Sequence, residues 1–138
     1  MTPVEFAEVQ AEFEEFLDLG DENNLDKKVF QQSRYYHKAL THYIVELNIL
    51  KEYKARRTKV WKEVYHELRF GNNRSFQLEH KWQFDNYVTG HDRYQAIDKL
   101  VNSQESVVAY FKGILDAINN LGYAVKNYIE VKKLTQGI

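Results

Sequence analysis

Hydrophobic residues along this chain recur mostly at steps of three and four, the spacing that places side chains on one face of an α-helix. The longest such run covers residues 27–70, where the sequence holds neither Gly nor Pro. Its apolar positions keep a single heptad frame, which comprises Val29, Tyr36, Leu40, Tyr43, Leu47, Leu50, Trp61, Val64 and Leu68. The pattern predicts one long helix that packs lengthwise against a neighbouring helix.

The first 26 residues predict a shorter amphipathic helix. Thr2 can cap it, Pro3 suits its first position and Glu5 completes a capping box, while Gly20 is a natural stop. Its apolar face is aromatic and comprises Phe6, Val9, Phe13 and Phe16. Two interpretations stay open: a helix docked on its own core, and an element that binds a partner or masks the basic segment that follows.

A second long helix is expected from Asp92 to Leu121, with Gly122 ending it and a short helix covering about 123–134. Its heptad frame is interrupted by Gln104 and otherwise comprises Ile97, Leu100, Val107, Phe111, Ile114, Ile118 and Leu121. Further apolar positions at Val101, Val108 and Leu115 widen this stripe beyond what one neighbour can cover. We therefore expect it to face both the first long helix and another copy of the chain, with Gln104 fixing the register.

Between the long helices the hydrophobic period changes. Residues 71–73 read as a helix stop and turn, and residues 75–84 then alternate between aromatic or apolar and polar side chains. This alternation predicts a half-buried strand, paired with residues 86–89 or with another subunit. The expected fold is mainly α: long antiparallel helices, a short extended segment at about 75–84 and a C-terminal helical oligomerisation region.

Charge is sorted by segment, although the net charge is only -1. Residues 1–26 hold nine acidic and no basic residues, residues 27–74 hold twelve basic and four acidic residues, and residues 75–138 hold seven of each. The densest basic stretch comprises Lys51, Lys54, Arg56, Arg57, Lys59, Lys62, Arg69 and Arg74. A polyanion would therefore meet the middle of the chain as a strongly positive surface.

This basic stretch is organised on the predicted helix. At 100° per residue, Lys51, Lys59, Lys62 and Arg69 fall within about 80° of one another. Lys54 and Arg57 instead occupy apolar frame positions, where a tightly packed helix would desolvate them, so they indicate an open seam or a bound anion. A nucleic-acid backbone is the commonest ligand for such a stripe, and the alternative is a solvated face whose cations pair with acids such as Glu63 one turn away.

Composition and motifs exclude several other classes. The chain has no Cys, no phosphate-cradling Gly-rich loop and no nucleophile turn, and its five His lack metal-ligand spacing. We expect no catalytic residue, no metal and no cofactor. Neither a secretory signal nor a membrane span is present in the sequence, so a cytoplasmic protein is expected. Twenty aromatic side chains, among them Trp61, Tyr65 and Phe70 near the basic stretch, suit helix packing or base stacking.

Specific segments resemble a known family. Phe111-Lys112-Gly113-Ile114-Leu115-Asp116-Ala117-Ile118, the stretch 121–129 and the closing Leu134-Thr135-Gln136-Gly137 are similar to the C-terminal end of UvsY, the recombination mediator family of T-even-like phages. Residues 87–92 are similar to the family segment before its last long helix. The resemblance covers roughly residues 29–138. When the family's turn is aligned with Gly71, its basic motif falls at Lys59–Val64, with Lys62 as the best counterpart.

The resemblance implies a non-enzymatic protein of a phage-infected bacterial cell. UvsY proteins bind single-stranded DNA, form rings of six or seven copies through C-terminal helices, and load a RecA-like recombinase, UvsX, onto DNA covered by the phage single-strand binding protein. On this basis residues 27–91 are expected to bind DNA and residues 92–138 to assemble the ring, with 1–26 as an acidic helix. The alternative is a coiled-coil scaffold whose basic face binds an acidic protein partner.

Overall fold

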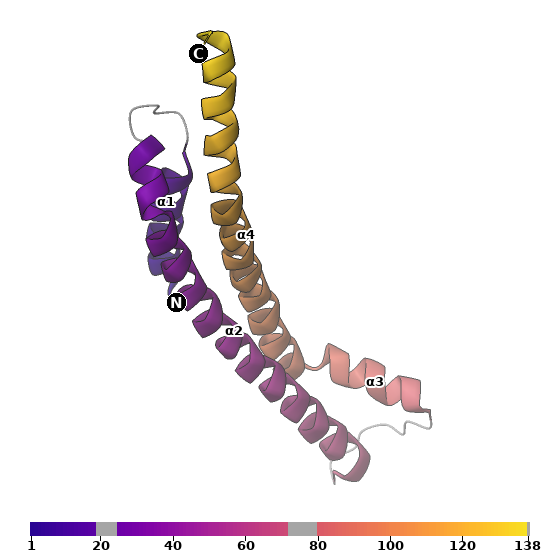
Figure 1. Cartoon of the computed structure of the whole chain (residues 1–138). Helices are drawn as coiled ribbons and strands as arrows, with labels where there is room; N and C mark the ends of the chain where they lie inside the picture. Colours follow the sequence, from indigo (N-terminus) through magenta and orange to yellow (C-terminus); the bar gives the residue numbers. More distant parts are fainter. Residues whose placement is uncertain (19–24, 72–79, 138) are drawn as a thin grey trace. The chain divides into compact units, whose positions relative to one another are not determined.

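The computed structural model describes residues 1–18, 25–71 and 80–137, and these ranges contain four helices and no strand. In chain order the helices are α1 (Pro3–Leu17), α2 (Leu25–Phe70), α3 (Lys81–Gly90) and α4 (Asp92–Thr135) (Figure 1). The expected mainly α fold is confirmed. No helix in these ranges combines the length and the apolar character that a membrane crossing requires.

The described chain divides into two compact units, to each of which α2 and α4 both contribute. Unit 1 comprises Met1–Tyr43 with Tyr110–Ile138, and unit 2 comprises Ile44–Ala109. Within both units α2 and α4 run antiparallel, because higher numbers on α2 meet lower numbers on α4. Gln32 meets Ile118 in unit 1, and Arg57 meets Asp98 in unit 2.

Helix α1 begins as its sequence predicts. The Thr2 hydroxyl accepts a hydrogen bond from the Glu5 backbone N–H at 3.2 Å, and the Glu5 carboxylate accepts one from the Thr2 N–H at 3.0 Å. The helix ends at Leu17, and the expected stop at Gly20 lies outside the described residues. Phe13 and Phe16 are buried in unit 1, where Phe16 stacks on Tyr35 with ring centroids 4.0 Å apart. Of the two interpretations of this helix, docking on its own core is confirmed.

The expected strand at residues 75–84 is wrong in its described part. Residues 81–84 form the first turn of α3, and the partner strand expected at 86–89 is helical as well. The residues that α3 buries are Phe84 and Val88, four positions apart, while Trp82 is 62% exposed. Two aromatic residues two positions apart fitted an alternating pattern, but the burial follows the helical period. Residues 75–79 lie outside the described ranges.

Helix α4 continues through the position where a break was expected. Gly122 lies inside it, although glycine costs a helix about 1 kcal/mol relative to Ala. The Gln32 amide group passes close to this glycine, since a Cβ built there would lie 3.4 Å from Gln32 Nε2 and Oε1. Gln32 Nε2 donates to the Ile118 carbonyl at 2.9 Å. A Cβ at this position would meet Gln32 at an ordinary van der Waals distance, so the contact does not require glycine. The predicted role of Gly122 as a helix stop is wrong.

A polar pair is buried between α2 and α4 in unit 2. Glu46 is 2% exposed, and Gln104 Nε2 donates to its carboxylate at 2.6 Å and to its backbone carbonyl at 2.9 Å. Gln104 thus pairs within the chain. Because a buried carboxylate without a donor is costly, this pair aligns the two helices along their length.

Replacing Tyr110 with Phe is expected to stabilise the protein by about 1 kcal/mol in urea unfolding. The Tyr110 hydroxyl is buried in unit 1 and has no hydrogen-bond partner among the described residues, while its ring packs edge-on against Phe6 at 5.2 Å. Phenylalanine keeps that ring and removes the unpaired group. A variant less stable than the parent would contradict this account.

The gain from Tyr110→Phe should grow at alkaline pH. Burial, and secondarily the Glu14 carboxylate, raises the pKa of Tyr110 above its ordinary value of 10.0. Tyrosine in the unfolded chain ionises near pH 10 while the folded protein keeps Tyr110 neutral. Ionisation therefore favours the unfolded chain, and the parent protein loses stability as the pH rises past that value, whereas the Phe variant does not lose it at this position. Unfolding at pH 7.5 and pH 10.5 should show a wider gap at the higher pH.

Candidate nucleic-acid interface

Two cations predicted to mark an open seam are paired with carboxylates of α4. Arg57 Nη1 lies 2.8 Å from Asp98 Oδ1, and Lys54 Nζ lies 3.6 Å from Glu105 Oε1, all within unit 2. The seam is therefore closed by ion pairs at these positions. Asp98 and Glu105 were missed in the sequence, although their seven-residue spacing beside the apolar frame is the signal that could have identified them.

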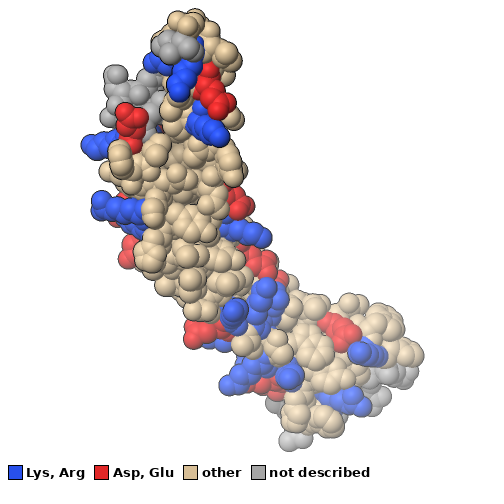
Figure 2. Space-filling model, viewed as in Figure 1, with Lys and Arg blue, Asp and Glu red and all other residues tan. Residues whose placement is uncertain are grey.

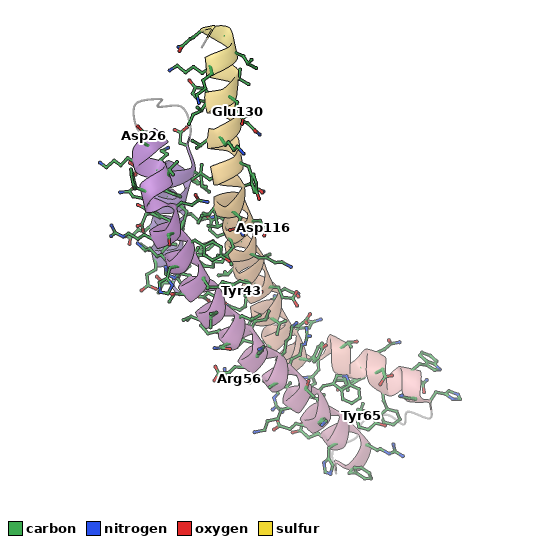
Figure 3. All side chains as sticks on the ribbon, viewed as in Figure 1. Asp26, Tyr43, Arg56, Tyr65, Asp116 and Glu130 are labelled. Carbon is green, nitrogen blue, oxygen red and sulfur yellow. The ribbon has the colours of Figure 1, made fainter. Side chains whose placement is uncertain are left out.

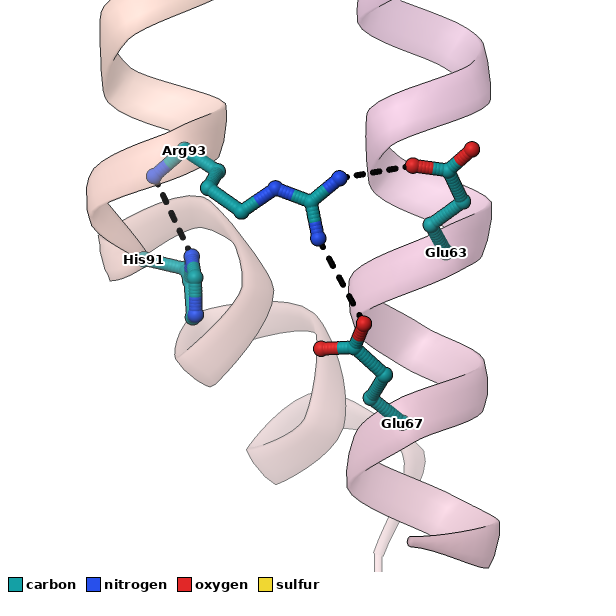
Figure 4. A network of polar contacts seen from close by, with 4 residues as sticks. All are labelled: Glu63, Glu67, His91 and Arg93. Carbon is teal, nitrogen blue, oxygen red and sulfur yellow. Dashed lines mark hydrogen bonds and ion pairs between the residues drawn. The ribbon is translucent and has the colours of Figure 1, made fainter.

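Two acidic residues of α2, Glu63 and Glu67, pair with a cation of α4. Arg93 extends from the first turn of α4 to Glu63, with 2.7 Å between Nη2 and Oε2, and to Glu67, with 3.4 Å between Nη1 and Oε1 (Figure 4). The Arg93 backbone N–H also donates to His91 Nδ1 at 3.2 Å. Since Arg93 takes both carboxylates, the expected alternative in which they pair with lysines one turn away on α2 is not what the structure shows.

Of the four lysines of α2 that were predicted to bind DNA, Lys54 is paired, and three form no ion pair with a described residue: Lys51, Lys59 and Lys62. All three are exposed and lie on the side of α2 opposite the buried Val64. Arg69, on the same side, donates to the Tyr65 hydroxyl at 2.9 Å and is likewise exposed. We call these four residues the lysine stripe, which runs for about 27 Å along α2.

The other predicted DNA-binding residues flank the stripe or lie outside the description. Arg56 is an exposed residue of α2 (Figure 3). Its guanidinium lies 5.9 Å from the centre of the Tyr53 ring. Arg74 lies outside the described residues. Over the face drawn in Figure 2, blue basic and red acidic side chains stand side by side along the molecule. The cations of unit 2 that form ion pairs with carboxylates are neutralised, so a positive surface can come only from those without such a pair among the described residues.

Aromatic side chains adjoin the stripe. Trp61 stacks on Tyr65, with ring centroids 5.1 Å apart and planes 12° apart, and Tyr65 in turn contacts Phe84 of α3 at 5.6 Å. Trp61 and Tyr65 are partly exposed, whereas Phe70 is 63% exposed. The candidates for base stacking are therefore at the surface and held in place by neighbouring rings.

The predicted oligomerisation residues divide into two groups. Most of them are already buried within the single chain and fill the core between α2 and α4: Ile97, Phe111, Ile114, Ile118 and Leu121. Val107 and Gln104 are partly buried, and Leu100 is 47% exposed. Other apolar side chains near the end of α4 are also exposed: Ile129 (40%), Val131 (61%) and Leu134 (82%). An interface between copies through the predicted frame stays a prediction.

In the ranges that the structure describes, no three His, Asp or Glu side chains gather where they could hold a metal ion. The interface described above consists of cations, the carboxylates that pair with some of them, and aromatic rings. A family model described as recombination, repair and ssDNA binding protein UvsY matches residues 15–138.

The chain belongs to the UvsY family. The resemblance drawn from its C-terminal segments is thereby confirmed, and so are its functions as a non-enzymatic, single-stranded-DNA-binding protein of recombination and repair. The match also begins at residue 15, within α1, so it reaches further upstream than the resemblance. No curated protein matches the chain by sequence.

Three crystal structures of the bacteriophage T4 recombination mediator protein UvsY share this fold. The lattice type II structure aligns with a TM-score of 0.79 and 16% identity, covering 99% of this chain and 98% of that one. The type IV structure gives 0.78, 14% identity and coverage of 94% and 98%. The type I structure gives 0.76, 17% identity and coverage of 93% and 98%. The chain thus shares the fold of these structures over nearly its whole length.

Proposed function

We propose that this UvsY-family chain is a recombination mediator that holds single-stranded DNA on the lysine stripe of α2. Assembled copies would organise the strand so that a RecA-like recombinase of the UvsX type nucleates on it while phage single-strand binding protein is displaced. The observation that carries the proposal is the set of exposed lysines at positions 51, 59 and 62, none of which forms an ion pair with a described residue. The place of action would be the cytoplasm of a phage-infected bacterium.

The charge distribution of unit 2 supports phosphate capture. Glu63 and Glu67 are engaged by Arg93, and Glu52 stands one helical turn from Arg56, whose charge offsets it. The lysine stripe therefore keeps its positive charge in spite of the acids on the same helix. An extended positive face of this kind binds the phosphate backbone without reading sequence.

Salt should weaken DNA binding steeply. If each subunit neutralises about four phosphates, log K for oligo(dT) should fall against log salt with a slope of about -3 per subunit site. Titrations by fluorescence anisotropy between about 0.05 and 0.3 M salt measure this slope. A flat response would contradict phosphate capture and would favour the scaffold alternative, in which the basic face binds an acidic protein.

Self-assembly into a ring of six or seven copies would strengthen a weak DNA site by avidity. The support for assembly is the exposed apolar end of α4, where Ile129, Val131 and Leu134 project from a helix that buries nothing beyond Val125 in the described chain. Exposed apolar side chains grouped at one helix end are typical of a contact with another molecule. A second copy of the chain is the proposed occupant.

Replacing Ile129, Val131 and Leu134 with Ser is expected to reduce the assembled mass toward the 16.5 kDa of one chain. The buried core of α2 and α4 is untouched by these changes, so helix content should stay the same. Light scattering gives the mass and circular dichroism gives the helix content. A variant that stays fully assembled would show that these three residues do not form the interface, and other exposed apolar residues such as Leu100 would then be the candidates.

A further inference from the structure

Beside the lysine stripe lies a hollow of about 250 Å³ within unit 2. Arg57, Thr58 and Trp61 line it from α2, and Tyr94 lines it from α4. Trp61 and Tyr94 are both partly exposed, so the two aromatic side chains reach the surface here. Neither aromatic side chain is completely buried by the rest of unit 2, so part of each ring is accessible to a ligand.

The lining residues are held in place by their neighbours. Trp61 is stacked on Tyr65, and Tyr65 receives a hydrogen bond from Arg69 at 2.9 Å. Arg57 is fixed by its ion pair with Asp98 at 2.8 Å. A flat ligand entering the hollow would therefore meet an ordered indole and an ordered guanidinium, at little cost in side-chain entropy.

The volume suits one aromatic ring of a nucleobase. A cavity of about 150 Å³ accepts benzene, so a hollow of about 250 Å³ has room for a pyrimidine ring with its substituents. Tryptophan, tyrosine and arginine are the side chains on which bases of single-stranded nucleic acids stack. The hollow matches that ligand in both size and chemistry.

The hollow also lies next to the lysine stripe, where the phosphates of the proposed DNA strand would bind. At 100° per residue, Thr58 lies about 20° from Lys51 and about 40° from Lys62 around the α2 axis. A strand whose phosphates follow the lysine stripe would pass the Thr58 side of the hollow. Its bases could then turn toward Trp61 and Tyr94.

We propose that this hollow holds one base of the single-stranded DNA, in contact with both Trp61 and Tyr94, while the neighbouring phosphates lie on the lysine stripe. The inference rests on the proposed function, since the stripe must bring the strand to the hollow. It adds an attraction that depends on bases but not on their sequence. DNA without bases would keep the phosphate contacts and lose this part of the affinity.

The chain offers a matched pair of fluorescent reporters, because Trp61 and Trp82 are its two tryptophans. In a Trp82→Phe variant, Trp61 emission should be quenched as oligo(dT) saturates the protein. An abasic oligonucleotide with the same number of phosphates should bind without quenching. In a Trp61→Phe variant, the remaining Trp82 on α3 should respond little to either DNA.

These outcomes separate the two proposals. Saturating oligo(dT) binding, measured by anisotropy, without quenching of Trp61 would overturn the base site and leave phosphate capture standing. Equal quenching of Trp61 by the abasic strand, or of Trp82 by oligo(dT), would overturn it as well. If neither oligonucleotide bound, the result would contradict the proposed DNA-binding face and therefore the base site as well.

A Tyr94→Leu substitution provides a second test. Loss of one base stack should weaken oligo(dT) binding by about 5- to 150-fold, the range expected for one stacked base. Binding of the abasic strand should be unchanged. Tyr123→Leu, at a 71% exposed tyrosine of α4 in unit 1, is the matched control and should affect neither strand. Equal losses for both strands in the Tyr94 variant would contradict a base contact.

Discussion

Replacing Lys51, Lys59 and Lys62 together with Ala is expected to weaken single-stranded DNA binding by about 100-fold at about 0.1 M salt. Each phosphate contact adds about 0.7 to the slope of log K against log salt, so three contacts add about 2. Relative to about 1 M salt, where counterion release contributes little, such a slope raises the binding constant about 100-fold. Anisotropy titrations with oligo(dT) measure both the loss and the reduced slope.

A control with the same change in net charge is available on α4. Lys99, Lys112 and Lys126 are exposed and outside the lysine stripe, and no ion pair joins them to a described residue. Their replacement with Ala should cost less than about tenfold in affinity, through the general field of the protein. If both triple variants lost affinity equally, net charge would explain the binding and the stripe would not be the site.

Replacing Phe111 with Ala is expected to destabilise the protein by about 3–5 kcal/mol, which is a large part of the stability of an ordinary domain. Its side chain is 0% exposed in unit 1. It stacks on His42 at 5.1 Å and meets Phe13 edge-on at 6.4 Å, so truncation removes contacts with both α1 and α2. Urea unfolding followed by circular dichroism measures the loss.

Leu100 supplies the comparison for Phe111, since both belong to the apolar frame predicted for oligomerisation. Leu100 is 47% exposed, and its truncation to Ala should cost less than about 1 kcal/mol. If Phe111→Ala lowered the assembled mass while leaving the unfolding midpoint unchanged, Phe111 would belong to an interface between copies and its burial within the chain would be incidental.

The long helices could be predicted from the sequence because their signals are local and agree with one another. Thr2 and Glu5 form a capping box that starts α1. The long helix α2 runs without Gly or Pro from residue 27 to Phe70 and ends beside Gly71. Each of these signals depends on residues that are neighbours in the sequence. Gly122 could not be interpreted in the same way. A glycine can end a helix or lie inside one, and here α4 continues past it, beside the contact with Gln32 that lies 90 residues earlier in the chain.

The basic residues of the candidate site could be predicted from the sequence, but the ion pairs that some of them form with carboxylates of α4 could not. Whether a lysine of α2 is available to DNA depends on which carboxylate α4 places beside it, and this depends on the alignment of two distant segments. Lys54 and Lys62 look alike in sequence, yet Lys54 has Glu105 within 3.6 Å and Lys62 has no such partner among the described residues. A heptad frame likewise cannot distinguish burial within one chain from burial between two, because both need the same apolar face.

The buried pair of Glu46 and Gln104 restricts how the two long helices can evolve. Helices of 46 and 44 residues with repeating apolar frames could slide past each other by a heptad, about 10 Å, and still cover much of their apolar surface. Such a shift would leave the buried Glu46 carboxylate without the hydrogen bond from Gln104 Nε2. Substitutions at these two positions should therefore be tolerated only together, whereas most of the frame is free to drift among apolar residues, and a double-mutant cycle would show this as coupling.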